Sequence, residues 1–151
     1  MPEGVVGELY EGLPDLPAFN PDDDYEPLHP VVARLRQAIA RSDAVLFCTP
    51  EYAGALPGSF KNLLDWTVGG GEIYGKPVAW INVAAEGRGT NAEASLATVL
   101  GYVGATVIRE ACVRLTVARD ALGPDGTVTD DEFRRGAADV VQTILRFLRA
   151  T

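Results

Sequence analysis

The residues best suited to chemistry follow an apolar run in the first third of the chain. Ala44–Thr49 (AVLFCT) ends at Pro50, and residues 51–56 (EYAGAL) then combine a glutamate and a tyrosine with small residues, ahead of a possible helix start at Pro57. Small residues allow backbone amide groups to approach a flat ligand closely. We therefore expect this segment to bind a planar molecule.

A second loop of the same kind follows a second apolar run. Pro77–Val83 (PVAWINV) leads into residues 84–89 (AAEGRG). In an open parallel sheet, ligands bind beyond the carboxyl ends of the strands, at the point where the strand order reverses. The loops after Thr49 and Val83 are therefore the predicted ligand-binding positions.

Other reactive side chains favour structural interpretations. Cys48 and Cys112 lie in apolar, strand-like runs, where a cysteine is expected to be a small buried hydrophobe rather than a redox or metal group. His29 precedes Pro30 at a predicted helix start and has no second ligand nearby, which indicates a surface residue rather than a metal site. The acidic run Asp22–Asp24 could bind a cation, but a solvated loop or a helix-capping role is favoured.

The surrounding elements alternate between strand and helix patterns. Apolar runs predict strands at Val5–Leu9, Ala44–Thr49, Pro77–Val83 and Thr106–Val117, and prolines and glycines predict a long loop at Tyr10–Pro27. Helical periodicity predicts helices at Leu28–Arg41, from Pro57 to about Thr67, and at Asn91–Val103 before Gly104. A last helix is predicted from a capping box at Thr129 and Glu132 to the end of the sequence. This alternation predicts a single α/β domain over residues 1–151, with an open parallel sheet of four strands and helices on both faces. Ala44–Thr49, apolar throughout, is expected to be a central strand covered on both faces.

Charge and length exclude several classes of partner. The chain has 151 residues with 13 basic and 21 acidic side chains, a formal net charge of −8, which disfavours binding to nucleic acid or to anionic lipid. No apolar run reaches the roughly 18 residues needed to span a bilayer, and Met1–Tyr10 lacks the features of a signal peptide. We expect a cytoplasmic protein with no nucleic-acid or membrane partner.

The first loop and the helix after it carry a recognisable motif. Residues 50–66, PEYAGALPGSFKNLLDW, resemble the P-E-Y-x-x-x-x-P-x-x-x-K-N-x-x-D-W signature of the NADPH-dependent FMN reductase family. The resemblance implies a flavodoxin-like sheet that binds FMN across its strand ends. It also implies hydride transfer from NADPH or NADH to the flavin, and onward to a flavin, quinone or azo acceptor.

The same resemblance implies the site residues. In the family, the residues at Pro50, Glu51, Tyr52, Ala53 and Gly54 line the isoalloxazine ring, largely through backbone groups, and the loop at Glu86, Gly87, Arg88 and Gly89 lies near the far side of the ring. Because the cofactor supplies the difficult chemistry, no catalytic acid, base or metal ligand is assigned. Family members are commonly dimers or tetramers, so a homodimer or homotetramer is implied.

Each of these assignments has a plainer alternative. Tyr52 could be a surface aromatic residue and Glu51 a solvated carboxylate, and Lys61 with Asp65 could be an ordinary (i, i+4) ion pair. Trp66, Tyr74 and Trp80 are expected in the core or at a subunit contact.

Two departures from the family pattern bear on cofactor binding. Ala53 stands where the family usually has asparagine or another polar residue. Before the segment matching Val5–Leu9, the family has a strand, a G-S-x-R-x-x-S-x-N loop that holds the FMN phosphate, and a helix. We therefore expect an N-terminally incomplete flavodoxin-like sheet, in which Val5–Leu9 either pairs with Ala44–Thr49 directly or leaves the centre of the sheet unpaired. FMN would then bind weakly or not at all.

This expectation leaves an alternative of a different class. The chain could be a non-catalytic remnant of the fold that acts as an oligomerising or binding module. A receiver domain of the response-regulator type ranks last, because no strand-end aspartate and lysine accompany an acidic pocket.

Overall fold

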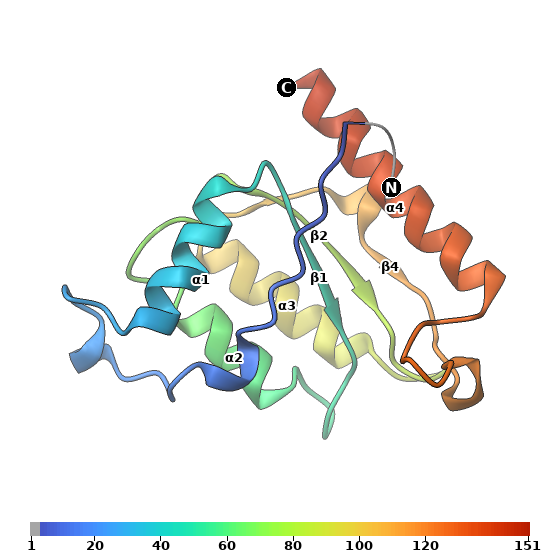
Figure 1. The fold of residues 1–151 in the computed structure, drawn as a ribbon, viewed down its shortest axis with the longest axis horizontal. Helices are drawn as coiled ribbons and strands as arrows, with labels where there is room; N and C mark the ends of the chain where they lie inside the picture. Colours follow the sequence, from blue (N-terminus) through green and yellow to red (C-terminus); the bar gives the residue numbers. More distant parts are fainter. Residues whose placement is uncertain (1–3) are drawn as a thin grey trace.

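A computed structural model describes residues 4–151 of the chain, and its elements alternate as predicted (Figure 1). The helices are α1 (Pro30–Arg41), α2 (Gly58–Asp65), α3 (Thr90–Tyr102) and α4 (Asp131–Ala150), and the strands are β1 (Val45–Thr49), β2 (Pro77–Asn82), β3 (Thr106–Val107) and β4 (Val113–Arg114). All strand pairs are parallel. The predicted α/β class is therefore confirmed.

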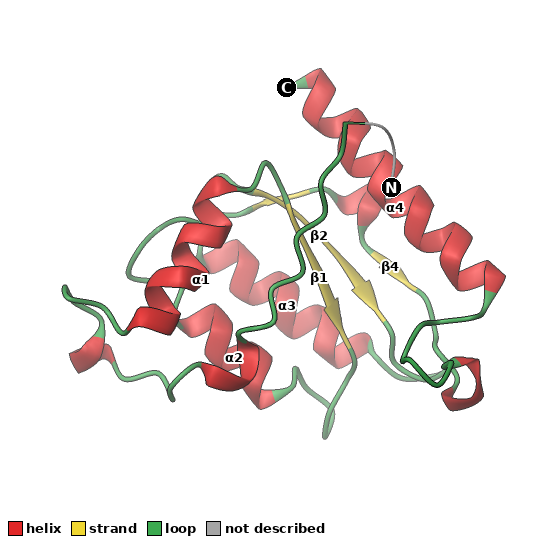
Figure 2. Cartoon of the chain, viewed as in Figure 1, coloured by secondary structure: helices red, strands yellow, loops and turns green. Residues whose placement is uncertain are grey.

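The central strand of the sheet is β2. It pairs with β1 along one edge, from Val45 opposite Val78 to Thr49 opposite Asn82, and with both β3 and β4 along the other. Because β1 and β2 are parallel and in register, their carboxyl ends meet at the same edge of the sheet (Figure 2). The two predicted ligand loops thus begin side by side.

Helices cover both faces of the sheet, as predicted. Residues of β1 and β2 such as Phe47 and Trp80 pack in one apolar cluster with α1, α2 and α3. On the other face, Ala79 and Ile81 of β2 pack in a second cluster with α4. The two clusters contain alternate residues of β2, because successive side chains of a strand point to opposite faces of the sheet.

Two predicted strands differ from the structure. The segment Val5–Leu9 joins no strand ladder, and Val6 and Leu9 are 93% and 83% exposed, so its apolar residues have no core to enter. The run Thr106–Val117 is divided into β3 and β4 by a 3₁₀ turn at Arg109–Ala111. That turn buries Ala111 against α4, so tertiary packing overrides the local strand pattern.

Strand β1 is an edge strand rather than the central one expected. Among residues 4–151 it pairs only with β2. Leu46 and Cys48 lie on the sheet face that α4 packs against, but α4 covers β2 there and not β1, so Leu46 is 38% exposed and Cys48 is exposed as well. The predicted burial of Cys48 is therefore wrong, whereas Cys112 is half-buried. The apolar composition of a strand does not by itself determine how many neighbouring strands pair with it.

The helix ends follow local hydrogen-bonding chemistry. His29, exposed as predicted, caps α1 because its Nδ1 accepts the backbone N–H of Val31 at 3.3 Å. The capping box predicted at Thr129 is off by one residue, since the Asp130 carboxylate caps α4 by accepting the Phe133 N–H at 2.7 Å. Thr129 instead donates its hydroxyl to the Ala121 carbonyl.

The long loop before α1 is anchored to the core by polar contacts. Arg36 of α1 is buried, and its guanidinium donates to Asp24 at 2.6 Å and, through two N–H groups, to the Trp66 carbonyl. Oε2 of Glu72 lies 3.8 Å from the same guanidinium and has no hydrogen-bond partner among the described residues. Asp24 is therefore an ion-pair partner within the protein, while Asn20 caps the turn Pro21–Asp23.

Within residues 4–151, no group of three or more His, Cys, Asp or Glu side chains is placed to hold a metal ion. None of the helices described there combines the length and apolar character needed to cross a membrane.

Candidate functional site

The loop after β1 forms a tight turn at the strand edge. Tyr52 and Ala55 exchange two backbone hydrogen bonds of 2.9 Å each, and the residues between them, Ala53 and Gly54, have φ values of 48° and 73°. Reciprocal bonds around two positive φ angles are the pattern of a type I′ turn. Tyr52 is 68% exposed beside the turn. The loop therefore projects backbone groups and one aromatic ring from the end of β1.

Ala53 occupies a backbone conformation that suits asparagine or glycine better. A left-handed conformation costs an ordinary L-residue about 1 kcal/mol, and Asn-Gly is the favoured pair for a type I′ turn. We expect Ala53→Asn to raise the free energy of unfolding by about 0.5–1 kcal/mol in urea denaturation. Ala55→Asn, two residues away at an exposed position without a positive φ, is the control and should change little. Equal effects of the two substitutions would contradict this account of the turn.

Glu51 links this loop to the start of α3. Its Oε2 accepts the backbone N–H groups of Asn91 and Ala92 at 3.1 and 3.2 Å. The residue before α3, Gly89, has no side chain to cap the helix, so a carboxylate from another loop performs that role. Glu51 is thus a capping residue, more constrained than a solvated carboxylate.

The loop after β2 is held by one buried side chain. Asn82, fully buried at the end of the strand, accepts the Ala84 N–H through Oδ1 at 3.0 Å. Its Nδ2 donates to the Gly89 carbonyl and to the Glu93 carboxylate, both at 2.9 Å. Asn82 is a polar residue at the end of an otherwise apolar strand, and this position in the sequence could have indicated its role. Sequence reasoning missed it.

The predicted ring-contacting residues gather at one edge of the sheet. Pro50–Gly54 follow β1, and residues 86–89 follow β2, with Glu51 joining the two loops through α3. Glu86 and Arg88 are exposed, and Gly87 and Gly89 have φ values of 74° and 98°. The structure therefore places all nine predicted residues in two adjoining loops.

The backbone of these loops suits a planar cofactor with carbonyl groups. Among the described residues, the N–H groups of Ala53, Gly54, Glu86 and Gly87 have no hydrogen-bond acceptor. A Cβ added at Gly87 would meet no atom within 4 Å, so this position is open. Free donors of this kind can bind the carbonyl oxygens of an isoalloxazine ring. The first amides of α3 are already bound by Glu51 and are not free to hold a phosphate.

Charged groups near the loops form ion pairs, and the Cys48 thiol nearby is not activated. Arg114 of β4 donates to Glu93 at 2.8 and 3.1 Å, and this hydrogen bonding raises the pKa of the guanidinium. Partial burial of the sulfur raises the pKa of the Cys48 thiol, which disfavours the reactive thiolate. Lys61 and Asp65 form the expected (i, i+4) pair at 2.6 Å.

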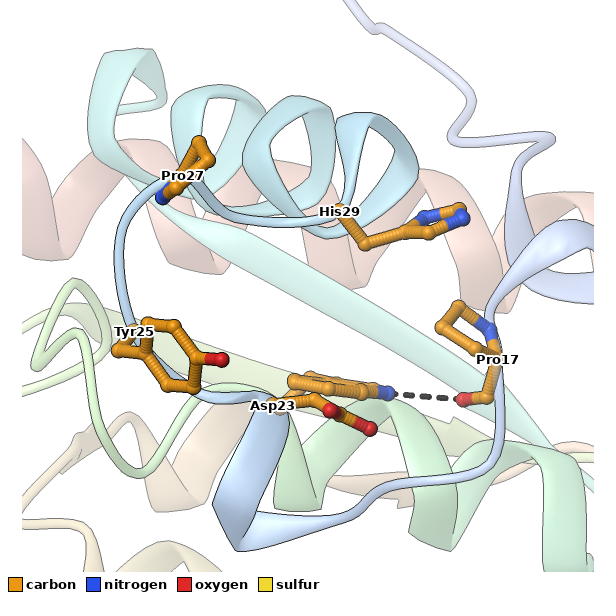
Figure 3. A pocket seen from close by; sticks show the side chains of 6 residues that line it. Pro17, Asp23, Tyr25, Pro27 and His29 are labelled. Atoms are coloured by element: carbon orange, nitrogen blue, oxygen red, sulfur yellow. Dashed lines mark hydrogen bonds between the residues drawn. The ribbon is translucent and has the colours of Figure 1, made fainter.

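Two cavities lie away from these loops. One, of about 360 Å³, is lined by Pro17, Asp23, Tyr25, Pro27, His29 and Trp66, and the Trp66 indole N–H donates to the Pro17 carbonyl beside it (Figure 3). The other, of about 320 Å³, lies on the outer side of α3. Neither includes a residue of the two strand-end loops. We place the candidate site at the loops because they offer free backbone donors, whereas the Trp66 indole is already paired.

The predicted aromatic positions divide between core and surface. Trp66 and Trp80 are buried in the core, as expected. Tyr74 is exposed, so it is not a core residue in the single chain.

Comparison with known proteins identifies the family of the chain. Residues 2–120 match the family described as NADPH-dependent FMN reductase. The chain is 33% identical over 146 residues to an NADPH azoreductase of Bacillus sp. strain OY1-2, covering 95% of this chain and 76% of that protein. It is 30% identical over 152 residues to an NAD(P)H-dependent FMN reductase of Pseudomonas aeruginosa, covering 99% and 82%.

A solved structure supports the same relationship. The fold is similar to that of FerB, a flavoenzyme NAD(P)H:(acceptor) oxidoreductase from Paracoccus denitrificans, with a TM-score of 0.74 and 30% identity over 91% of this chain and 78% of that one. The flavodoxin-like arrangement expected from the resemblance is thereby confirmed. With the match over residues 2–120, these findings show that the chain belongs to the NADPH-dependent FMN reductase family.

Proposed function

We propose that this chain transfers hydride from NADPH or NADH to FMN held at the loops after β1 and β2, and from there to a flavin, quinone or azo acceptor. FMN supplies the redox chemistry when bound, and the protein supplies position and access. The observation that carries the proposal is the pair of adjoining strand-end loops with free backbone donors at Ala53, Gly54, Glu86 and Gly87.

The names of relatives support this reaction class. Besides the azoreductase and the FMN reductase, a 2-hydroxy-1,4-benzoquinone reductase from a Burkholderia species is 30% identical over 80% of this chain. These sequence similarities favour an enzyme over a non-catalytic remnant of the fold. Pro50–Gly54 would contact one side of the ring and residues 86–89 the other.

The direct test is a titration of FMN with the purified protein. Saturable quenching of flavin fluorescence, together with FMN-dependent oxidation of NADPH or NADH in the presence of a quinone, is the expected result. The ratio of the dissociation constants for riboflavin and FMN measures how tightly the phosphate is held. Absence of both signals would refute the proposal and favour the binding module.

A matched pair of glycine variants tests the location of the site. Gly54 in the first loop and Gly71 before β2 both have φ of 73°, a conformation that valine adopts only under strain. Each valine substitution should lower the free energy of unfolding by about 1–2 kcal/mol. Only Gly54→Val is expected to weaken FMN binding, by about tenfold or more, because Gly71 precedes β2 at the opposite end of that strand. Equal loss of FMN affinity in both variants would argue against these loops.

We also propose that the protein is a cytoplasmic homodimer or homotetramer. The free edge of β1 and the exposed rings of Tyr74 and Tyr102 support self-association. A dependence on nicotinamide dinucleotides supports the cytoplasmic location. Sedimentation equilibrium of the purified chain should give two or four times the chain mass of 16.1 kDa, and a mass of 16.1 kDa would contradict the proposal.

A further inference from the structure

We infer that Asn82 is a positioning residue for the second flavin loop, and that Glu93 and Arg114 fix its orientation. The inference rests on the proposed function, because it assigns a task within that same site. None of these three residues belongs to the ring-contacting set.

The first step is that Asn82 closes the loop across its base. The amide oxygen accepts the Ala84 N–H, and the amide nitrogen donates to the Gly89 carbonyl. These two contacts join the first and last residues of segment 84–89 to one side chain that is fully buried. The backbone donors at Glu86 and Gly87 therefore lie on a loop whose two ends are both fixed.

The second step is that Glu93 selects one orientation of the amide. An ionised carboxylate only accepts hydrogen bonds, so the group facing Glu93 must be the Asn82 NH₂, as it is at 2.9 Å. With the amide reversed, its oxygen would face both the carboxylate and the Gly89 carbonyl. That reversed state has two acceptor–acceptor contacts and, at the Ala84 N–H, a donor–donor contact, so it is disfavoured.

The third step is that Arg114 fixes Glu93. Its guanidinium donates to both carboxylate oxygens, at 3.1 Å from Nε and 2.8 Å from Nη2, a bidentate geometry that restricts rotation. A further contact of 3.4 Å reaches the Thr90 hydroxyl. The polar chain thus runs from β4 through the first turn of α3 to the end of β2 and the loop.

The test uses Asn82→Asp, which keeps the shape of the side chain and one acceptor but removes the donor. Hydrogen exchange of backbone amides 84–89 in flavin-free protein should accelerate by at least about tenfold, because the substitution removes the hydrogen bonds to the Gly89 carbonyl and to Glu93 and places a second carboxylate beside Glu93. FMN should bind about tenfold more weakly for the same reason. Glu93→Gln, at a partly exposed position, should give smaller changes in the same direction, because it removes one of the contacts that select the amide orientation while the Gly89 carbonyl and the Ala84 N–H remain.

Asn62→Asp is the matched control. Asn62 makes the same kinds of bond, accepting the Phe19 N–H at 2.7 Å and donating to the Pro17 carbonyl at 2.9 Å, but it anchors the loop before α1. Its substitution should destabilise the fold and speed exchange around residues 17–19. Exchange of residues 84–89 and FMN affinity should stay at wild-type values. A merely structural role of Asn82 predicts that both variants weaken FMN in proportion to lost stability.

The outcomes separate this inference from the proposed function. Wild-type exchange at residues 84–89 in Asn82→Asp, or unchanged FMN affinity despite faster exchange, overturns the inference. If the wild-type protein does not bind FMN, the proposed function fails, yet the exchange data still decide whether Asn82 holds the loop. If Asn82→Asp does not fold, Glu93→Gln decides: faster loop exchange supports the inference, and unchanged exchange overturns it.

Discussion

Replacing Arg36 with methionine is expected to lower the free energy of unfolding by about 3 kcal/mol. Methionine fills much of the same space, but it leaves the buried Asp24 carboxylate without its cation and the Trp66 carbonyl without two donors. Uncompensated buried charge is more costly than the loss of the pair itself. Urea denaturation followed by tryptophan fluorescence measures the change.

Arg34→Met provides the control for Arg36. Arg34 lies on the same helix but is exposed, so its substitution should change stability by less than about 0.5 kcal/mol. Adding Asp24→Asn to Arg36→Met should recover part of the loss, because the orphaned charge is removed. A small effect of Arg36→Met alone would show that the buried ion pair contributes little.

Gly89→Ala is expected to damage both stability and cofactor binding. Gly89 has φ of 98°, and a Cβ there would lie 2.5 Å from Nδ2 of Asn82. The new methyl group combines backbone strain with displacement of the side chain that closes the loop. We expect a loss of about 2 kcal/mol in unfolding free energy and at least about tenfold weaker FMN binding.

Comparison with Gly87→Ala isolates the effect of displacing the Asn82 side chain. Gly87 also has a positive φ, 74°, but a Cβ there meets nothing within 4 Å. Its substitution should cost about 1 kcal/mol from strain alone. Denaturation curves of both variants provide the comparison, because Gly87 is itself a predicted ring contact and FMN affinity would not separate the two effects. Equal losses of unfolding free energy in Gly89→Ala and Gly87→Ala would mean that the contact with Asn82 is unimportant.

The sequence predicted the two strand-end loops better than the contacts that hold them. The PEYAGALPGSFKNLLDW motif and the strand-end rule located both loops, because turn residues and apolar runs are local signals. The roles of Glu51 and Asn82 depend on contacts 40 residues and 7 residues along the chain, to Asn91 and Gly89. No local pattern specifies such partners.

The errors in the fold have the same origin. Val5–Leu9 has strand-like residues, yet pairing needs a neighbouring strand, and the structure provides none for that segment. The burial expected for Cys48 failed because α4 covers β2 and not β1. Asp130, rather than Thr129, caps α4. Both residue types are suitable N-caps, and the sequence alone does not indicate which of two adjacent candidates forms the cap. Long, periodic elements such as α1 were predicted closely, whereas three-dimensional neighbours were not.

The shared attachment of both loops to α3 has an evolutionary consequence. Glu51 of the first loop and Asn82 of the second both bind residues 91–93 in the first turn of this helix. Substitutions in contact with a common partner are generally non-additive. A change that improves one loop for a new electron acceptor will therefore depend on which residues the other loop carries. Acceptor preference in this protein is expected to diverge through paired substitutions, with strong epistasis across the two loops.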